Sequence, residues 1–396
     1  MSHIKQVLSI IPSLRREGSK FESAELQNIV REILPDSRVA ACLRHRLSNS
    51  SVTVSTTERG NTRLGGLMVC DSSHICPVCH SRKMAKEQQI VSRIVHDHYQ
   101  AGGILLAAAL TAPHQVYEPL SENLDQMESI WKCFRSPAIW KRFADKLGIV
   151  GCVRRLEVTL GANGWHPHLH VMFLCKSEQA KEITGHSWRT ALDDAFHIVS
   201  THWRQAGGKA GIIINENAQA AVAIIEHIDA QRTVNYNTKN MGCCKKPNSL
   251  TPIDLLRVVA QSDNGSVTYA AKQLFKEYAT AVKGKHTLTY SGSAKLSRND
   301  AVKSADAAST DVVEDKLGTI SPDAWSAIIR AGLRGYLAVV KSRRELVAIV
   351  LRAALRSGHR HIPLRWMRLA FTAKTKTVIR SSAISPAPDT MVTLCM

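Results

Sequence analysis

Three histidines at alternate positions, His166, His168 and His170, are the residues of this chain best suited to carry out chemistry. Alternate side chains of a β-strand point to the same face. The run from Trp165 to Leu174 therefore predicts a strand that presents a row of imidazoles, which are common metal ligands. The apolar residues of the opposite parity predict a core face, and these are Leu169, Val171 and Phe173.

A carboxylate is expected beside this row. The segment 153–160 alternates in the same way and predicts the partner strand, with Gly161-Ala162-Asn163-Gly164 as the hairpin loop. A loop centred on 162–163 places Glu157 opposite His168, and one centred on 163–164 places it opposite His170. Two imidazoles and a carboxylate with open coordination positions suit a catalytic divalent ion such as Mn, Mg or Zn. A polar strand face without a metal is the alternative.

A second candidate site consists of cysteines. Cys76 and Cys79 form a Cys-Pro-Val-Cys knuckle, a spacing that lets two thiolates bind one tetrahedral zinc. Cys70 and Cys42 would complete a structural site of four thiolates. Any one ligand could be replaced by a nearby histidine, namely His45, His74 or His80. A redox pair and a set of buried, unliganded thiols are the alternatives.

Tyr236 and Lys239 form the third candidate pair. They are three residues apart in a segment, 218–240, that we expect to be helical, so they share a helix face. A phenol with its ordinary pKa of about 10 is a poor nucleophile. A neighbouring ammonium and a metal-polarised phosphate make its attack on phosphorus feasible. The pair alone is a weak pattern, and an exposed tyrosine on an amphipathic helix is the alternative.

The elements that must position these groups predict an α+β fold. Around the hairpin, the expected order is strand, helix, hairpin, helix, strand and helix, at residues 104–111, 121–147, 153–174, 179–205, 211–215 and 218–240. This is the order of a split βαβ, or RNA-recognition-like, antiparallel sheet. Such a sheet has one face under helices and one free for a ligand.

Composition limits the class of protein. The chain has 396 residues, which suggests two or three domains, and a net charge of +19, which points to nucleic acid as a partner. The longest apolar run is too short to cross a membrane and no secretory signal is seen, so we expect a cytoplasmic protein whose ten cysteines are metal ligands and isolated thiols. We expect an N-terminal region with the zinc knuckle and a basic helix, a catalytic domain, a linker, a basic helical region and a disordered tail, at 1–100, 101–296, 297–319, 320–374 and 375–396.

Between about Cys70 and Leu296 the chain resembles the rolling-circle plasmid replication initiators of the histidine–hydrophobic–histidine (HUH) endonuclease superfamily. The run Gly-Trp-His-Pro-His-Leu-His at 164–170 is highly specific to that family. Supporting segments are Cys-Pro-Val-Cys at 76–79, Leu110-Thr111 with His114, Arg-Leu-Glu-Val-Thr at 155–159, Tyr236-x-x-Lys239, Ser-Leu-Thr-Pro-Ile-Asp-Leu-Leu at 249–256 and Tyr290-Ser291.

The resemblance implies an endonuclease that nicks one DNA strand at an origin. His168, His170 and Glu157 would hold Mg or Mn, and Tyr236 would attack the phosphate, giving a 5′-phosphotyrosine and a 3′-hydroxyl primer. Lys239 would position or neutralise that phosphate. Supporting roles fall to His166 and His114. Some relatives carry a glutamate four residues before the tyrosine to activate water, but Arg232 stands there in this chain, and Asp229 is the available substitute if its helix is unbroken.

The partners implied are plasmid origin DNA, as a single-stranded or cruciform nick site, together with a host helicase and DNA polymerase. An HUH transposase or relaxase would share the chemistry and differ in DNA substrate. A zinc-dependent DNA-binding regulator would need the knuckle and the basic charge but not the histidine hairpin.

Overall fold

The computed structural model describes residues 3–48, 51–57, 60–116, 118–176, 188–215, 221–225, 227–238, 248–309, 313–359 and 366–369. Proximity of Cα atoms divides the chain into two compact units. The first unit joins residues 1–16 to 73–307, and the second joins 17–72 to 308–396. Among the helices described, none has both the length and the apolar character needed to cross a membrane.

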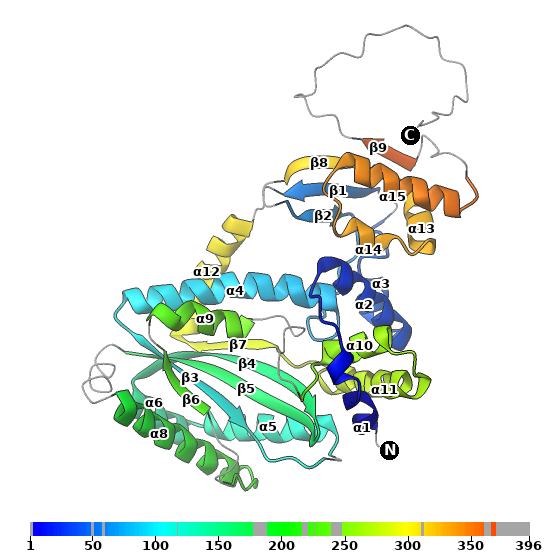
Figure 1. The fold of residues 1–396 in the computed structure, drawn as a ribbon. Coiled ribbons are helices and arrows are strands. Elements are labelled where there is room, and N and C mark those ends of the chain that lie inside the picture. Colours follow the sequence, from blue (N-terminus) through cyan, green and yellow to red (C-terminus); the bar gives the residue numbers. More distant parts are fainter. Residues whose placement is uncertain are drawn as a thin grey trace. The chain divides into compact units, whose positions relative to one another are not determined.

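The first unit is built on a five-stranded antiparallel sheet with the order β6-β3-β5-β4-β7 (Figure 1). Its strands are β3 (Ile104–Thr111), β4 (Ile149–Gly161), β5 (Gly164–Cys175), β6 (Ala221–Ile225) and β7 (Leu288–Gly292). Its helices are α1 (His3–Leu8), η1 (Ile11–Ser13), α4 (Pro77–Gln100), α5 (Leu120–Phe134), α6 (Pro137–Leu147), α8 (Trp188–Lys209), α9 (His227–Thr238), α10 (Pro252–Gln261), α11 (Gly265–Ala281) and α12 (Ser293–Ser309). The expected α+β class with an antiparallel sheet is confirmed.

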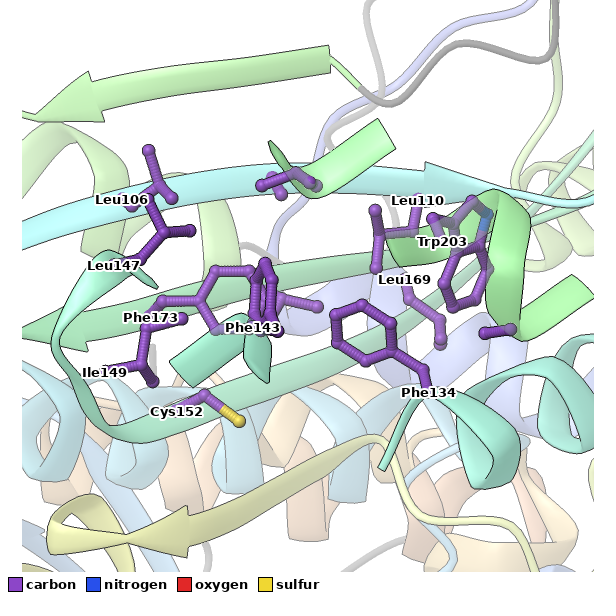
Figure 2. Close-up of a cluster of buried hydrophobic side chains, with 14 of the residues drawn as sticks. Leu106, Leu110, Phe134, Phe143, Leu147, Ile149, Cys152, Leu169, Phe173 and Trp203 are labelled. Carbon is purple, nitrogen blue, oxygen red and sulfur yellow. The ribbon is translucent and has the colours of Figure 1, made fainter. Parts of the chain in front are cut away.

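One face of this sheet is covered by α5, α6 and α8 and forms the main core. Leu169, Val171 and Phe173 of β5 lie in it, as the alternation predicts. The rings of Phe134 and Phe143 pack edge to face at a centroid distance of 4.8 Å, close to Phe173 (Figure 2). This packing holds the hairpin rigidly from the side that carries no histidine.

The opposite face is covered only along part of the strands. Apolar residues of α4, α9 and α12 pack there on Leu105, Val153, Met172 and Leu174. The expectation of a wholly free second face is therefore wrong. Because alternate residues share a face, the covered part begins at Met172, directly beyond the histidine row on the same strand.

The second unit contains a four-stranded antiparallel sheet with the order β2-β1-β8-β9. Its elements are α2 (Lys20–Ile33), α3 (Arg38–Ala41), β1 (Val52–Thr57), β2 (Thr62–Gly65), β8 (Val313–Ile320), α13 (Pro322–Arg330), α14 (Arg334–Leu337), α15 (Arg343–Arg356) and β9 (Met367–Leu369). Strands β1 and β8 and helices α13, α14 and α15 enclose one core around Trp325. Ser321 caps α13 by accepting a hydrogen bond from the Ala324 amide at 3.3 Å, and Pro322 is its first residue.

The strand expected at 211–215 and the helix expected at 218–240 are both wrong in part. Residues 211–215 form no strand, and the strand at this sheet edge is β6, paired with β3 from Ala221 to Ile225. Helix α9 starts only at His227. The free edge of β3 can pair with one segment only, and β6 occupies it. Without a partner strand, residues 211–215 would form no backbone hydrogen bonds in an extended conformation.

One further expectation is corrected. The helix expected over 121–147 is interrupted at Ser136, since Pro137 has no amide hydrogen and begins α6 as a new helix. The segment expected as a linker, 297–319, runs from the first unit into the second, and its described residues belong to α12 and β8. The tail expected to be disordered, 375–396, lies outside the described residues.

Candidate metal and nucleophile site

The hairpin of β4 and β5 pairs Gly161 with Gly164 around the two-residue turn Ala162-Asn163. Glu157 is therefore the cross-strand partner of His168, which is one of the two registers that the sequence allows. Gly164 has φ +88°, and a Cβ there would lie 2.8 Å from the Val116 carbonyl oxygen. Only glycine fits this position without strain, so Gly164 fixes the register that aligns the site.

Four imidazoles form a continuous row on this face of the sheet. Ring centroids are 4.6 Å apart between His114 and His166, 4.1 Å between His166 and His168, and 6.0 Å between His168 and His170. The last two rings are nearly parallel, at 9°. Glu157 lies beside the row, and its Oε2 is 2.7 Å from His170 Nε2.

Glu157 and His168 are buried, at 8% and 7% exposure, whereas His166 and His170 are partly exposed. Glu157 thus contacts one histidine and is the cross-strand partner of another, beside two imidazoles that solvent partly reaches. Among the described residues, however, these three side chains do not form a set whose ligand atoms all lie within 4.8 Å of one another. Glu157 contacts His170, and binding of all three side chains to one ion would require a change in side-chain conformation.

On the β3 side, the positions paired with His170 and Met172 carry only methyl groups. Ala109 pairs with His170 on one side and Ala221 on the other, and Ala107 pairs with Met172 and Ala223. Ala221 and Ala223 are exposed and the other two are partly exposed. We call these four residues the alanine floor. This floor was not predicted, although alanines at alternate positions of β3 are visible in the sequence once its pairing with β5 is known.

Helix α9 lies on the histidine face of the sheet. Its Ala230 and Val234 pack with Leu105 and Met172, which share that face. Two side-chain bonds also join α9 to α4: Gln88 Nε2 donates to Asn235 Oδ1 at 2.6 Å, and Ser92 contacts Gln231 at 3.3 Å.

The predicted nucleophile pair belongs to this segment. Tyr236 is a residue of α9, two positions after Val234, but its side chain is outside the described part of the structure, as is the whole of Lys239. Asp229 is exposed in the first turn of α9, and the helix continues without a break from there to Thr238. The condition set for Asp229, an unbroken helix leading to Tyr236, is met.

Tyr290 is engaged in a different contact. It lies on β7 opposite Val153, and its hydroxyl donates a hydrogen bond to Glu87 Oε2 at 2.5 Å. Arg298 stands 5.0 Å from the Tyr290 ring and 3.5 Å from Glu87. Burial, and then the Glu87 charge, raise the pKa of Tyr290 far above its ordinary value. This tyrosine is poorly suited to be a nucleophile.

The four predicted cysteines come together. The sulfurs of Cys42, Cys70, Cys76 and Cys79 all lie within 4.8 Å of one another and all four residues are buried. Backbone amides point at two of these sulfurs, from Ser72 to Cys70 at 3.4 Å and from Cys79 to Cys76 at 3.5 Å. Cys76 is also the N-cap of α4, where the helix dipole favours a thiolate. The cluster could bind a metal ion.

Two of the alternative histidine ligands are hydrogen-bonded to backbone carbonyls, and the cysteine set does not include them. His80 Nδ1 is 2.7 Å from the Ser73 carbonyl oxygen, and His74 Nε2 is 2.9 Å from that of Lys285. Burial lowers the pKa of His80 to about 3 and that of His74 to about 4, so both rings are neutral and donate to these carbonyls at pH 7. His45 is exposed and the cysteine set does not include it.

The chain is basic, and its antiparallel sheet carries a histidine row beside a carboxylate. These features fit the class of DNA-processing proteins, and the comparison with known families agrees. The model of the Replication protein family matches residues 62–330, more than half of the chain, so this chain belongs to that family. The resemblance to plasmid replication initiators is thereby confirmed.

Two curated relatives are similar over part of their length. The "Protein rep" of Streptomyces lividans is 28% identical over 189 residues, which is 39% of this chain and 41% of the relative. The "Neomycin resistance protein" of Streptomyces cyanogenus is 26% identical over 189 residues, covering 40% of this chain and 43% of that protein. The matched region thus spans less than half of either relative. No solved structure is significantly similar to the chain.

Proposed function

We propose that this protein initiates rolling-circle replication of a plasmid by nicking one DNA strand at the origin, with Tyr236 as nucleophile. The observation that carries the proposal is the shared sheet face: the histidine row, Glu157 and helix α9 all lie on it. Membership of the Replication protein family supports an initiator over a transposase or relaxase. A regulator without catalysis would not need the buried Glu157 beside His168 and His170.

His168, His170 and Glu157 would hold a divalent ion, Mg or Mn. The mixed nitrogen and oxygen donors fit such an ion, and their location at the end of the covered face leaves coordination positions open. When bound, the ion would polarise the scissile phosphate and offset its charge. His166 and His114 continue the row and would keep the neighbouring rings in place.

The chemical step is a transesterification. The Tyr236 oxygen would attack phosphorus, the bond from phosphorus to the 3′ oxygen would break, and the phenolic proton would leave to solvent or a nearby base. The 3′ oxygen would take up a proton and become the primer for the host polymerase, while a host helicase unwinds the duplex ahead of it. Lys239 would neutralise the phosphate. Attack of a 3′-hydroxyl on the phosphotyrosine reverses the step and rejoins the strand.

Asp229 would activate water at termination. It precedes Tyr236 by seven residues, or about 10 Å along a continuous helix, and both positions fall on one side of α9 within two turns. Arg232 occupies the position of the glutamate seen in some relatives and carries the wrong charge for a base.

The alanine floor supports a single-stranded substrate. Methyl groups at 107, 109, 221 and 223 leave the face low beside the histidines, so a sugar or base next to the scissile phosphate has room against the sheet.

The cysteine cluster would hold a structural zinc. Four thiolates at Zn–S distances of about 2.3 Å place their sulfurs roughly 3.8 Å apart, a spacing that fits sulfurs already within 4.8 Å of one another. The zinc would fix the first turn of α4, and α4 in turn contacts α9 through Gln88 and Ser92.

The test uses the full chain with end-labelled single-stranded origin DNA and Mn or Mg. Wild-type protein should form a denaturant-resistant covalent adduct, and peptide mapping should place the nucleotide on Tyr236. Tyr236→Phe should abolish the adduct and keep the fold. Tyr290→Phe is the matched control and should still form it. An undiminished adduct with Tyr236→Phe would refute the proposal.

A further inference from the structure

Helix α15 of the second unit is anchored on one side only. Its apolar residues lie in the core with Trp325, and they are Leu346, Ile349, Val350, Ala353 and Ala354. The Ser342 side chain caps the helix by accepting from the Glu345 amide at 3.3 Å. The helix is therefore held in a fixed orientation, with its other side directed to solvent.

That other side is basic. Arg344, Ala348, Arg352 and Arg356 are exposed and follow one another at intervals of four residues. They form a stripe about 18 Å long on one helix face. We call these four residues the α15 stripe.

The helix carries one negative charge, in its first turn. Glu345 is its single acidic residue, and its carboxylate accepts hydrogen bonds from the Lys341 amide at 2.9 Å and the Ser342 hydroxyl at 3.0 Å. Arg343 lies off the stripe and pairs with Asp315 at 3.3 Å. One carboxylate in the first turn leaves the three arginines of the stripe with a net positive charge.

A basic hollow continues the stripe at its C-terminal end. It is lined by Arg330, Ala331, Arg356 and Ser357, and Arg356 Nη1 donates to the Ala331 carbonyl at 2.6 Å. Arg330 is exposed at the end of α13. The cationic surface therefore extends from one helix to the next.

We propose that the α15 stripe and Arg330 bind double-stranded DNA, with α15 in the major groove. The proposal rests on the proposed function for its choice of nucleic acid, and it adds a duplex-binding site separate from the nicking site. A major groove about 12 Å wide admits one helix, and arginines at four-residue spacing reach phosphates on its edges or guanines on its floor. Ala348 between them lets the helix backbone come close.

A protein partner fits this face less well. Leu355, at 54% exposure, is the one large apolar side chain of α15 that is strongly exposed. Protein interfaces have an apolar or aromatic centre, and the centre of this stripe is Ala348 between arginines. Charge complementarity to phosphate explains the composition of the stripe directly.

The test measures binding of the full chain to a fluorescent 20-base-pair duplex of mixed sequence over a range of salt. Arg344→Ala with Arg352→Ala should weaken duplex binding about 10-fold or more, and the slope of log affinity against log salt should become shallower by about 2. Ala348→Glu is a second variant and should weaken duplex binding by its charge alone. Adduct formation on single-stranded DNA should stay within about 2-fold of wild type, since neither change touches the hairpin.

The charge-matched control is Arg38→Ala with Arg44→Ala, two exposed arginines of the same unit outside α15. It should leave duplex affinity and its salt slope unchanged. Unchanged duplex binding by both α15 variants, or an equal loss in the control, would overturn the proposal, and so would a changed oligomeric state with duplex affinity retained. If wild type binds duplex through the stripe but forms no adduct, the nicking function fails and the duplex site stands.

Discussion

Glu157 reaches diagonally across the hairpin to His170, with 2.7 Å between Oε2 and Nε2, although the backbone pairs it with His168. One carboxylate is thus next to both histidines, by strand register to one and by hydrogen bond to the other. The two possible registers of the loop place Glu157 opposite different histidines. In the observed register Glu157 faces His168, and its side chain still reaches His170.

Removing either end of this contact should disable metal-dependent nicking. We expect Glu157→Gln and His170→Ala each to lower the nicking rate by at least about 100-fold, because loss of even an indirect ligand partner costs about 10- to 100-fold in affinity or activity. Calorimetric titration with Mn should show the matching loss of affinity. His197→Ala, an exposed histidine of α8, is the control. Full nicking by a variant that combines Glu157→Gln with His170→Ala, in metal-buffered solution, would exclude this site.

The hairpin was predictable because each of its signals is local. Alternation over 153–174 identifies both strands and their faces, and the glycines at 161 and 164 mark the turn. The neighbouring strand was not predictable in this way. Ile212, Ile213 and Ile214 have higher strand preference than the alanine-rich β6, yet Ile213 is 82% exposed and β6 takes the edge of β3. Pairing with a distant strand outweighs local preference there.

The ligand set of the cysteine cluster also depended on tertiary structure. Spacing identifies the Cys-Pro-Val-Cys pair, but Cys42 is 34 residues before Cys76. From the sequence alone, any of three histidines is a possible ligand in its place. The fold brings the Cys42 sulfur within 4.8 Å of the other three, which no sequence pattern announces, and the set includes neither His74 nor His80.

Metal removal should expose the role of that cluster. Purified protein is expected to contain one zinc per chain, and Cys76→Ser should lose it and melt at a lower temperature, because structural zinc contributes directly to folding. Plasma emission spectrometry and a thermal melt measure the two effects. Cys133→Ser, outside the cluster, should keep its zinc. A zinc-free wild type with four titratable thiols would contradict the assignment.

Tyr290 should matter for stability and not for chemistry. Tyr290→Phe removes the hydroxyl that donates to the buried Glu87 carboxylate, so we expect the free energy of unfolding to fall by about 1–3 kcal/mol. Urea denaturation measures it, with the exposed Tyr269→Phe as control. A stability equal to wild type would show that the contact with Glu87 contributes little.

Acid should weaken the junction between α4 and β3 through His98. Its Nε2 lies 3.1 Å from the Ile104 carbonyl oxygen and 3.0 Å from that of Cys175, and burial lowers its pKa below the ordinary 6.5. At a pH between the His98 pKa values of the folded and the unfolded chain, only the unfolded chain binds the proton. The contribution of neutral His98 to stability is therefore full above about pH 6.5 and is lost as the pH falls. Urea denaturation at pH 7.5 and 5.5 should show His98→Gln less sensitive to acid than wild type. Equal sensitivity would remove His98 as a cause.

A larger side chain on the alanine floor should weaken binding of single-stranded DNA without changing the affinity for the metal ion. Ala109 lies between His170 and Ala221, and a leucine there would stand on the face where we expect the strand beside the scissile phosphate. Ala109→Leu should raise KM for a single-stranded oligonucleotide about 10-fold or more, whereas Mn affinity should stay within about 2-fold, because Glu157 and the histidines approach from β4 and β5. Ala109→Ser keeps the floor low and should behave like wild type. If the leucine variant binds and nicks normally, DNA does not cross this part of the sheet. If Mn affinity falls as KM rises, the leucine has displaced His170 and the effect belongs to the metal site.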